Sequence, residues 1–346
     1  KSKRPVELPE GILTDDISSV TDNEDITIAV ELIGGTTVAK DLQQKLLKAG
    51  KHVVTANKAL LAEQGNELYE TAAQNDRVIA FEASCVGGVP IISALRTGLS
   101  ANEIDAMYGI LNGTCNYILS AMTSKGADFA SVLKKAQEKG YAEADPTLDI
   151  NGGDTAHKLA ILARLAFGAE IDFSDVYFEG IEKTSIDDIR YGQEMGYVLK
   201  LLAIAQKCQD GGISLRVHPS FISKDSLLAR VDGAFNAVSV FGHAVGQTMF
   251  YGRGAGMMPT ASAVVADIIE VALGNSQKLF SSQQISRAKI DSIENTTSRF
   301  YMRLLAKDEP GVVAAYGKIL GDHKISIRGA LQHEGTGPEN TVPVVI

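Results

Sequence analysis

The chain has 346 residues, of which 45% are hydrophobic, and a formal net charge of −9 at pH 7. This length predicts more than one domain with a sizeable core, and the acidic balance argues against nucleic acid as the main partner. No apolar run reaches membrane-spanning length, and three scattered cysteines (Cys85, Cys115 and Cys208) fit neither a disulfide framework nor a zinc site, which favours a reducing cytoplasm.

Strands and helices alternate in the first part of the chain. Strands are predicted at 26–33, 52–55 and 78–81, and helices at 38–49 and 58–75. This alternation indicates a parallel sheet with crossover helices, whose ligands bind at the carboxyl ends of the strands. Gly34 and Thr55 lie at those ends, and Lys58 follows closely. Lys58 is therefore a candidate for site chemistry, although a lysine in the first turn of a surface helix fits the same position.

The start of this sheet lacks a glycine-rich phosphate-binding turn. Dinucleotide-binding sheets normally open with a strand and a Gly-x-Gly-x-x-Gly turn, and none precedes Ile26. Two interpretations stay open at this point: the chain begins after that turn, or it binds no dinucleotide.

The loop 82–90, EASCVGGVP, contains two glycines and a proline. These residues impose an irregular backbone that can turn several carbonyl oxygens inward, and oxygen ligands of this kind suit a hard cation. A simple corner before the helix predicted at 91–99 is the more common meaning of such a loop.

A strand predicted at 104–110 leads into a glycine-containing helix entrance. Asn112 and Thr114 at this entrance can hydrogen-bond a ligand, and they can equally cap the helix that follows. Another helix is predicted at 130–139.

The stretch 140–168 combines a turn-rich acidic loop with a helix that is apolar almost all round. The loop acids are Glu143, Asp145 and Asp149. Such a helix is usually buried, and Asp154 and Lys158 share one face of its first turn. A buried ammonium needs an anionic partner and can pass a proton to or from a substrate oxygen. The alternative is structural: Asp154 caps the helix and pairs with Lys158, and the loop acids are solvated.

Beyond residue 168 the pattern changes to repeated strands, which indicate a mixed or antiparallel sheet and a natural surface for dimerisation. Strands are predicted at 176–181, 213–222, 235–241 and 245–251, a long helix at 186–206, and a helix at 260–273 that returns to the first sheet. After a polar linker, a small βαβ module is predicted, with strands at 299–306 and 324–328 around a helix at 312–320.

Five motifs, spread over most of the chain and in the family's order, resemble homoserine dehydrogenase. They are VVTANKALLA (53–62), FEASCVGGVPII (81–92), GILNGTCNYIL (109–119), GYAEADPTLDINGGDTAHKLAILA (140–163) and MFYGRGAGMMPTAS (249–262). The last segment, with KDEPGV, resembles the regulatory ACT domain found at the end of many such enzymes.

This resemblance implies an α/β fold class with three parts. They are a Rossmann-like parallel sheet truncated at its amino-terminal side, an α+β catalytic and dimerisation domain, and a partial carboxyl-terminal ACT-like βαβ module. The expected domains are 1–80 for nucleotide binding (partial, completed by about 252–275), 81–251 for catalysis and dimerisation, and 297–346 for regulation. Without the glycine-rich turn, the chain is expected to hold NAD(P) poorly.

The resemblance also implies an NAD(P)-dependent oxidoreductase that interconverts L-homoserine and L-aspartate 4-semialdehyde in cytoplasmic threonine and methionine biosynthesis. Hydride chemistry belongs to the cofactor, so neither a nucleophilic cysteine nor a catalytic zinc is needed. The expected partners are the amino-acid substrate, further copies of the chain in a homodimer or homotetramer, and threonine as an effector of the ACT-like domain.

The family's site residues are carried over by motif. Lys158 matches the proton-transferring lysine, and Lys58 matches a second lysine near the nicotinamide. Substrate binding is expected from Glu143, Asp149, Asp154 and Thr114. Cofactor binding is expected from Gly34 and Thr55 at the strand ends and from Lys58, Gly140, Glu143 and Gly256. A monovalent metal site, usually sodium, is expected from Glu82 and the carbonyl oxygens of Cys85, Gly87 and Val89.

A second function remains open beside the oxidoreductase. An inactive remnant could serve as a structural or amino-acid-sensing subunit through the ACT-like end. The missing glycine-rich turn favours this alternative, whereas the complete set of acids and lysines favours the enzyme.

Overall fold

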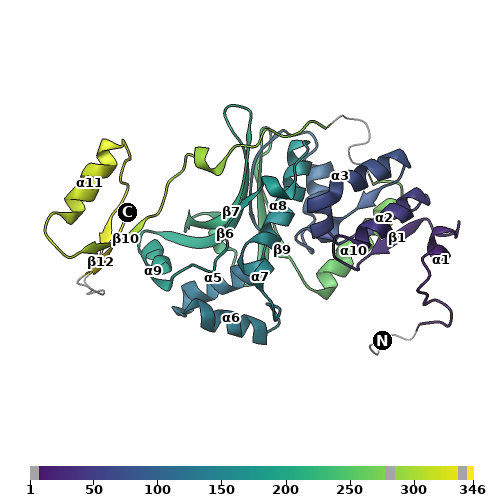
Figure 1. The fold of residues 1–346 in the computed structure, drawn as a ribbon, viewed down its shortest axis with the longest axis horizontal. Coiled ribbons are helices and arrows are strands. Elements are labelled where there is room, and N and C mark those ends of the chain that lie inside the picture. The colour runs from purple at the N-terminus through teal and green to yellow at the C-terminus, as the bar shows by residue number, and fades with distance from the viewer. Residues whose placement is uncertain (1–7, 277–284, 334–340) are drawn as a thin grey trace.

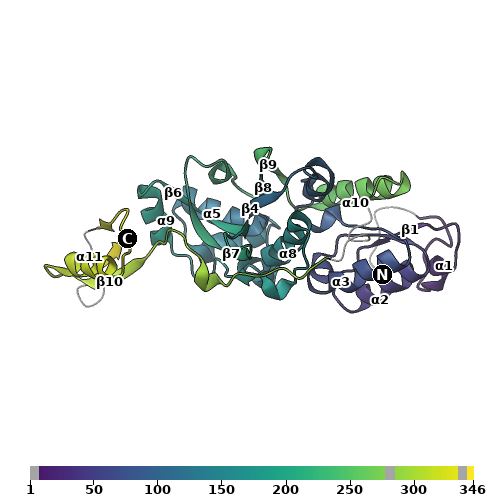
Figure 2. The same cartoon turned by 90° about the horizontal axis from the view of Figure 1, so that it is seen from above.

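The computed structural model describes residues 8–276, 285–333 and 341–346. Three sheets follow one another along an elongated molecule, with the amino-terminal sheet at one end and the carboxyl-terminal sheet at the other (Figures 1 and 2). In the described residues, no helix combines the length and apolarity needed to cross a bilayer.

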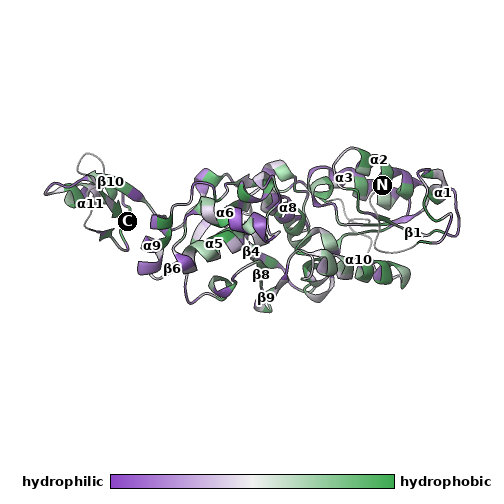
Figure 3. Ribbon diagram, turned by 90° about the horizontal axis from the view of Figure 1, so that it is seen from below, coloured by the Kyte–Doolittle hydropathy of each residue, from purple (hydrophilic) through white to green (hydrophobic). Residues whose placement is uncertain are grey.

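The first sheet is parallel, as predicted, with strand order β1-β2-β3. Its strands are β1 (Ile28–Glu31), β2 (His52–Thr55) and β3 (Ile79–Ala80), connected by helices α2 (Val38–Lys48) and α3 (Lys58–Gln74) after a short α1 (Ser18–Thr21). The expectation that a later helix returns to this sheet is also confirmed. Helix α10 (Met257–Ala272) packs Val264 and Val271 against Val54. Figure 3 shows that this helix is strongly apolar.

The middle sheet has six strands in the order β5-β7-β6-β4-β8-β9 and is antiparallel except where β5 meets β7. Its strands are β4 (Ile104–Ile110), β5 (Tyr177–Phe178), β6 (Tyr197–Lys207), β7 (Ile213–Ser223), β8 (Phe235–Gly242) and β9 (Gly246–Arg253). The helices of this region are α4 (Ile91–Ser93), α5 (Gly113–Lys125), α6 (Phe129–Glu138), α7 (Thr147–Ile150), α8 (Gly153–Phe167) and α9 (Ile186–Glu194). Helices α5, α8 and α9 pack on β6.

The prediction of one long helix at 186–206 is wrong. Helix α9 ends at Glu194, Gly196 adopts φ +85, and the chain continues as β6, paired with β4 and β7. The run YVLKLLAIA is apolar at nearly every position, and such a run fits a buried strand and a buried helix equally well. Strand pairing decides in favour of the strand, because β7 accompanies β6 along its whole length and β4 pairs with residues 203–206 on the other side.

The carboxyl-terminal module is a split βαβ unit. Strands β10 (Arg303–Lys307), β11 (Leu331–Gln332) and β12 (Thr341–Val345) form an antiparallel sheet in the order β10-β12-β11, and α11 (Val312–Asp322) connects the outer two. The strand predicted at 324–328 is wrong. Lys324 adopts a left-handed φ of +59, and ladder pairing begins only at Leu331.

Candidate active site

Helix α8 begins at a glycine that no other residue could easily replace. Gly152 occupies the N-cap position with φ +88, and a Cβ there would lie 3.1 Å from the carbonyl oxygen of Glu179. Asp154 therefore lies inside the first turn rather than at the cap, and its carboxylate is free to face the site. Lys158 Nζ, one turn later, lies 2.6 Å from Asp154 Oδ2 and donates a second hydrogen bond to the carbonyl oxygen of Leu111 at 2.8 Å. The predicted pairing of this lysine and acid is confirmed.

Packing of α3 against α8 brings a second lysine to the same carboxylate (Figure 1). Lys58 is the first residue of α3, a helix whose N-cap is Asn57. Its Nζ lies 2.9 Å from Asp154 Oδ1, on the opposite oxygen from Lys158. The Asp154 side chain is 4% exposed, so this buried carboxylate bridges two ammonium groups that belong to different parts of the fold.

The electrostatics of this bridge favour charged partners. Burial by itself raises the pKa of Asp154, but the charges of Lys158 and Lys58 outweigh it and hold the pKa well below its usual range. Burial by itself lowers the pKa of Lys58, but the charge of Asp154 more than compensates, so the pKa lies above its ordinary value. Lys58 therefore remains an ammonium group throughout the neutral pH range.

Asn112 connects this bridge to the acidic loop, a role that the sequence did not assign. Its Nδ2 donates to Asp154 Oδ2 at 2.8 Å and to Asp149 Oδ1 at 2.7 Å, and its Oδ1 accepts the backbone N–H of Cys115 as the N-cap of α5. The helix cap that the sequence allowed is therefore present, whereas the hydrogen bond to a ligand stays a prediction. Burial raises the pKa of Asp149.

The remaining substrate candidates do not all gather at this centre. Thr114 lies two residues after Asn112, in the first turn of α5, and donates to the carbonyl oxygen of Tyr141 at 2.6 Å. Glu143 lies in an exposed part of the loop, and in the described structure its backbone carbonyl accepts from Gln137 while no contact joins its carboxylate to the lysines. Gly140 lies two residues beyond the end of α6, has φ +72 and is exposed.

The three remaining cofactor candidates flank the first sheet. Gly34 adopts φ +79 directly after β1, with no atom within 4 Å of the position of an added Cβ. Thr55 is fully buried at the end of β2, and Gly256, with φ +119, is the N-cap of α10. Positive φ angles and open space at Gly34 leave room for a ligand to approach the backbone closely.

The loop expected to hold a metal contains two consecutive positive φ angles, at Val86 (+56) and Gly87 (+21). A β-branched residue rarely adopts this conformation. The Glu82 carboxylate accepts the backbone N–H groups of Ile92 and Ser93 at 2.9 and 2.8 Å, so its oxygens face the start of α4. In the described residues, no three His, Cys, Asp or Glu side chains form a metal-binding group.

A parallel α/β sheet, with two lysines on one buried carboxylate beside it, fits the class of nicotinamide-dependent oxidoreductases. Comparison with known proteins specifies the enzyme further. Residues 1–82 match the family model of the NAD-binding domain of homoserine dehydrogenase, and residues 90–269 match the model of homoserine dehydrogenase itself. The chain belongs to the homoserine dehydrogenase family.

Individual relatives agree over most of the chain. Homoserine dehydrogenase of Neisseria gonorrhoeae is 46% identical over 98% of this chain and 79% of its own length. The crystal structure of a homoserine dehydrogenase from Thiobacillus denitrificans has a TM-score of 0.89 at 47% identity, covering 96% of this chain and 77% of that one. A hyperthermophilic archaeal homoserine dehydrogenase in complex with NADPH has a TM-score of 0.66 at 28% identity, with 76% of each chain covered. The enzyme interconverts L-homoserine and L-aspartate 4-semialdehyde with NAD(P).

Proposed function

We propose that Lys158 and Lys58, joined by Asp154, manage the proton and the developing charge of this reaction. The observation that carries the proposal is the buried carboxylate with one ammonium group on each oxygen, at 2.6 and 2.9 Å. The nicotinamide cofactor, when bound, supplies the hydride that reaches the aldehyde carbon. Negative charge then grows on the aldehyde oxygen, where a fixed ammonium group stabilises it.

The two lysines have different proposed roles. Lys58 has a raised pKa and keeps its proton, which suits electrostatic stabilisation. Lys158 gives its proton to the alkoxide as the alcohol forms and regains one from solvent. Asp149 and Glu143 are proposed to bind the α-ammonium of the substrate, with Thr114 as a further contact. Gly34, Thr55, Gly140 and Gly256 are proposed to contact the cofactor.

Turnover of the full-length enzyme tests these roles. Homoserine-dependent reduction of NAD(P)+ is measured for the wild type, Lys158→Ala and Lys58→Ala. A positioned acid/base contributes about 10²–10⁴-fold, so Lys158→Ala should lose at least about a hundredfold in kcat with its fold intact. Lys40→Ala, which breaks a surface pair with Glu67, is the control and should keep full rate. An inert wild type would favour the amino-acid-sensing subunit instead.

We further propose a monovalent cation, sodium being the expected one, in the loop 82–89. Burial raises the pKa of the Cys85 thiol to about 12, so this side chain is neutral and unsuited to a hard cation. The proposed ligands are therefore the carbonyl oxygens of Cys85, Gly87 and Val89, with Glu82 nearby. Replacing sodium by a bulky organic cation at constant ionic strength should lower activity and melting temperature. No change in either measurement would refute the site.

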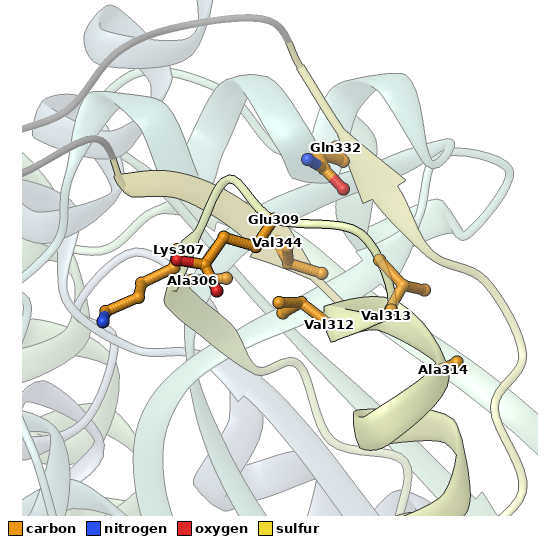
Figure 4. Close-up of a pocket in the computed structure, with 9 residues that line it drawn as sticks. Ala306, Lys307, Glu309, Val312, Val313, Ala314, Gln332 and Val344 are labelled. Atoms are coloured by element: carbon orange, nitrogen blue, oxygen red, sulfur yellow. The ribbon is translucent and has the colours of Figure 1, made fainter.

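The proposed effector site is a cavity of ≈200 Å³ in the carboxyl-terminal module, which we propose to be ACT-like (Figure 4). Its lining includes Glu309, Gly311, Val312, Gln332 and Val344. A carboxylate, a helix start and apolar walls together suit the ammonium, carboxylate and methyl groups of threonine. Threonine should inhibit turnover, and Glu309→Gln should weaken the inhibition without changing the basal rate. Activity that is indifferent to threonine would exclude this regulation.

We propose that the chain assembles as a homodimer or homotetramer through one face of the middle sheet. Tyr108 and Met249 are partly exposed there and pack against a small buried cluster, made up of Ile110, Leu202, Ile204, Leu228, Val231 and Ala237. Light scattering of the purified enzyme should give at least twice the chain mass. Met249→Lys should shift the population towards monomer, and a wild-type monomer would contradict the proposal.

Three domains and a cytoplasmic location complete the proposal. The division at 1–80 (with about 252–275), 81–251 and 297–346 is supported by the return of α10 to the first sheet. The three free cysteines, two of them buried, suit a reducing compartment. Limited proteolysis should cut first within the linker 275–297 if this division is correct.

A further inference from the structure

Glu31, the last residue of β1, is a buried anion surrounded by neutral donors. It is 1% exposed, and in the described residues its carboxylate has no lysine or arginine partner. Removing a carboxylate from water without a counter-charge is costly, and the cost is met here only by hydrogen bonds. These bonds, outweighing burial, hold the pKa of Glu31 below its ordinary value, so the group is ionised.

One oxygen of Glu31 holds the loop that follows β1. Oε1 accepts the backbone N–H groups of Ile33 at 2.6 Å and Gly34 at 3.1 Å. Two amides in succession fix the path of this loop, in which both Gly34 and Gly35 have positive φ angles and open space around them. The Glu31 side chain therefore holds the backbone of this loop, and space remains open beside Gly34 and Gly35.

The other oxygen holds the turn that follows β2. Oε2 accepts Gln43 Nε2 at 2.8 Å, Thr55 Oγ1 at 2.9 Å and, more weakly, Asn57 Nδ2 at 3.4 Å. Asn57 also donates to the carbonyl oxygen of Gly35 at 2.8 Å and caps α3 by accepting the N–H of Leu60 at 3.2 Å. This network ends directly before the helix that begins with the site lysine.

We propose that Glu31 is a positioning residue, whose carboxylate fixes the glycine loop after β1 relative to Lys58 and so aligns the cofactor-facing loop with the Lys58–Asp154 pair. The inference rests on the proposed roles of Gly34, Thr55 and Lys58. Three observations support the inference. The Glu31 side chain is buried, its two oxygens bind two different loops, and Asn57, which also binds Glu31, caps the helix that begins at Lys58. Errors of about 1 Å in such alignment can cost about a hundredfold in rate.

Two substitutions of Glu31 separate alignment from simple stability. Glu31→Ala removes both anchors, and we expect about a tenfold or larger rise in the NADPH dissociation constant, measured by calorimetry, with a fall in kcat of similar size. Glu31→Gln keeps one oxygen for the loop amides. Gln43 Oε1, buried without a hydrogen-bond partner, can rotate to accept the new amide. This conservative variant should restore most of the affinity and rate.

Thr71→Val is the matched control. Thr71 is buried in the same unit, and its hydroxyl donates only to the Glu67 carbonyl of its own helix at 2.7 Å, far from the loops in question. Its melting temperature should fall while NADPH affinity and kcat stay unchanged. If Glu31→Ala fails to fold, Gln43→Met takes its place, because it removes one donor to Oε2 at a residue outside the proposed cofactor contacts.

The outcomes are decisive for the inference. Unchanged affinity and kcat in folded Glu31→Ala, or in Gln43→Met where that variant replaces it, would overturn the inference. Losses in Glu31→Gln as large as those in Glu31→Ala would do the same. Full activity of Lys58→Ala would instead refute the proposed function of Lys58, whatever Glu31 does. Loss of rate in Lys58→Ala together with a normal Glu31→Ala would refute this inference alone.

Discussion

Lys58 and Asp154 are far apart in the sequence, yet their side chains meet at 2.9 Å across the boundary between the parallel sheet and the middle sheet. Lys58 starts α3 and Asp154 lies in the first turn of α8, so the packing of these two helices creates the contact. The proposed active centre therefore forms only when both parts of the fold pack against each other correctly.

Asp154→Asn should remove most of the activity and weaken the fold. The change leaves two ammonium groups beside a neutral amide, and breaking a buried pair in this way costs about 3–5 kcal/mol. We expect a fall in kcat of about a hundredfold or more. A double-mutant cycle with Lys58→Met, followed by urea unfolding, should give a coupling of about 0.5–3 kcal/mol. Additive effects would show that the two side chains act independently.

Asn112→Asp should impair catalysis without loss of the helix cap. The new carboxylate can still accept the N–H of Cys115, but it replaces the donor that serves Asp149 and Asp154 with a third negative charge. We expect about a 10–100-fold loss in kcat/KM from steady-state kinetics. Asp128→Asn, the opposite exchange at the exposed cap of α6, is the control and should be neutral. Equal kinetics of the two variants would contradict the bridging role of Asn112.

Gly180→Ala should displace the backbone that leads into α8 and so disturb the proposed site. An added Cβ would lie 2.0 Å from the carbonyl oxygen of Ile150 and 2.4 Å from Cα of Asn151, directly before α8. The backbone must move, which we expect to cost about 1–3 kcal/mol and to lower kcat. Gly98→Ala meets no atom within 4 Å and should leave the melting temperature and rate unchanged. A wild-type melting temperature for Gly180→Ala would show that this loop has room to adjust.

His157 should make stability depend on pH. Burial lowers the pKa of this histidine below its ordinary value of 6.5, with Glu63 acting in the opposite direction. The unfolded chain then binds more protons than the folded one, so stability should fall as pH drops from about 6.5 through the folded pKa. His157→Phe should flatten this part of the curve of unfolding free energy against pH. His323→Gln, at an exposed position, should retain the wild-type slope.

Local patterns predicted several elements correctly. The parallel alternation of the first sheet, the two strands β8 and β9, and the first turn of α8 with its acid–lysine pair are confirmed. Each of these depends on residues close in sequence, where hydrophobic period, glycine position and helical spacing act directly. The family motifs also predicted the reaction, which the comparisons confirm.

Other features were decided by contacts between distant segments. The segment from Tyr197 is a strand because β7 pairs with its whole length and β4 with its second half, and its apolar sequence contains no sign of those partners. The second ammonium group on Asp154, the amide bridge of Asn112 and the hydrogen bonds around Glu31 likewise join residues from separate elements. The sequence by itself determined which chemical groups are available and the pairing within one helical turn. Only the tertiary structure decided which groups share a carboxylate, because burial and distance depend on how the elements pack.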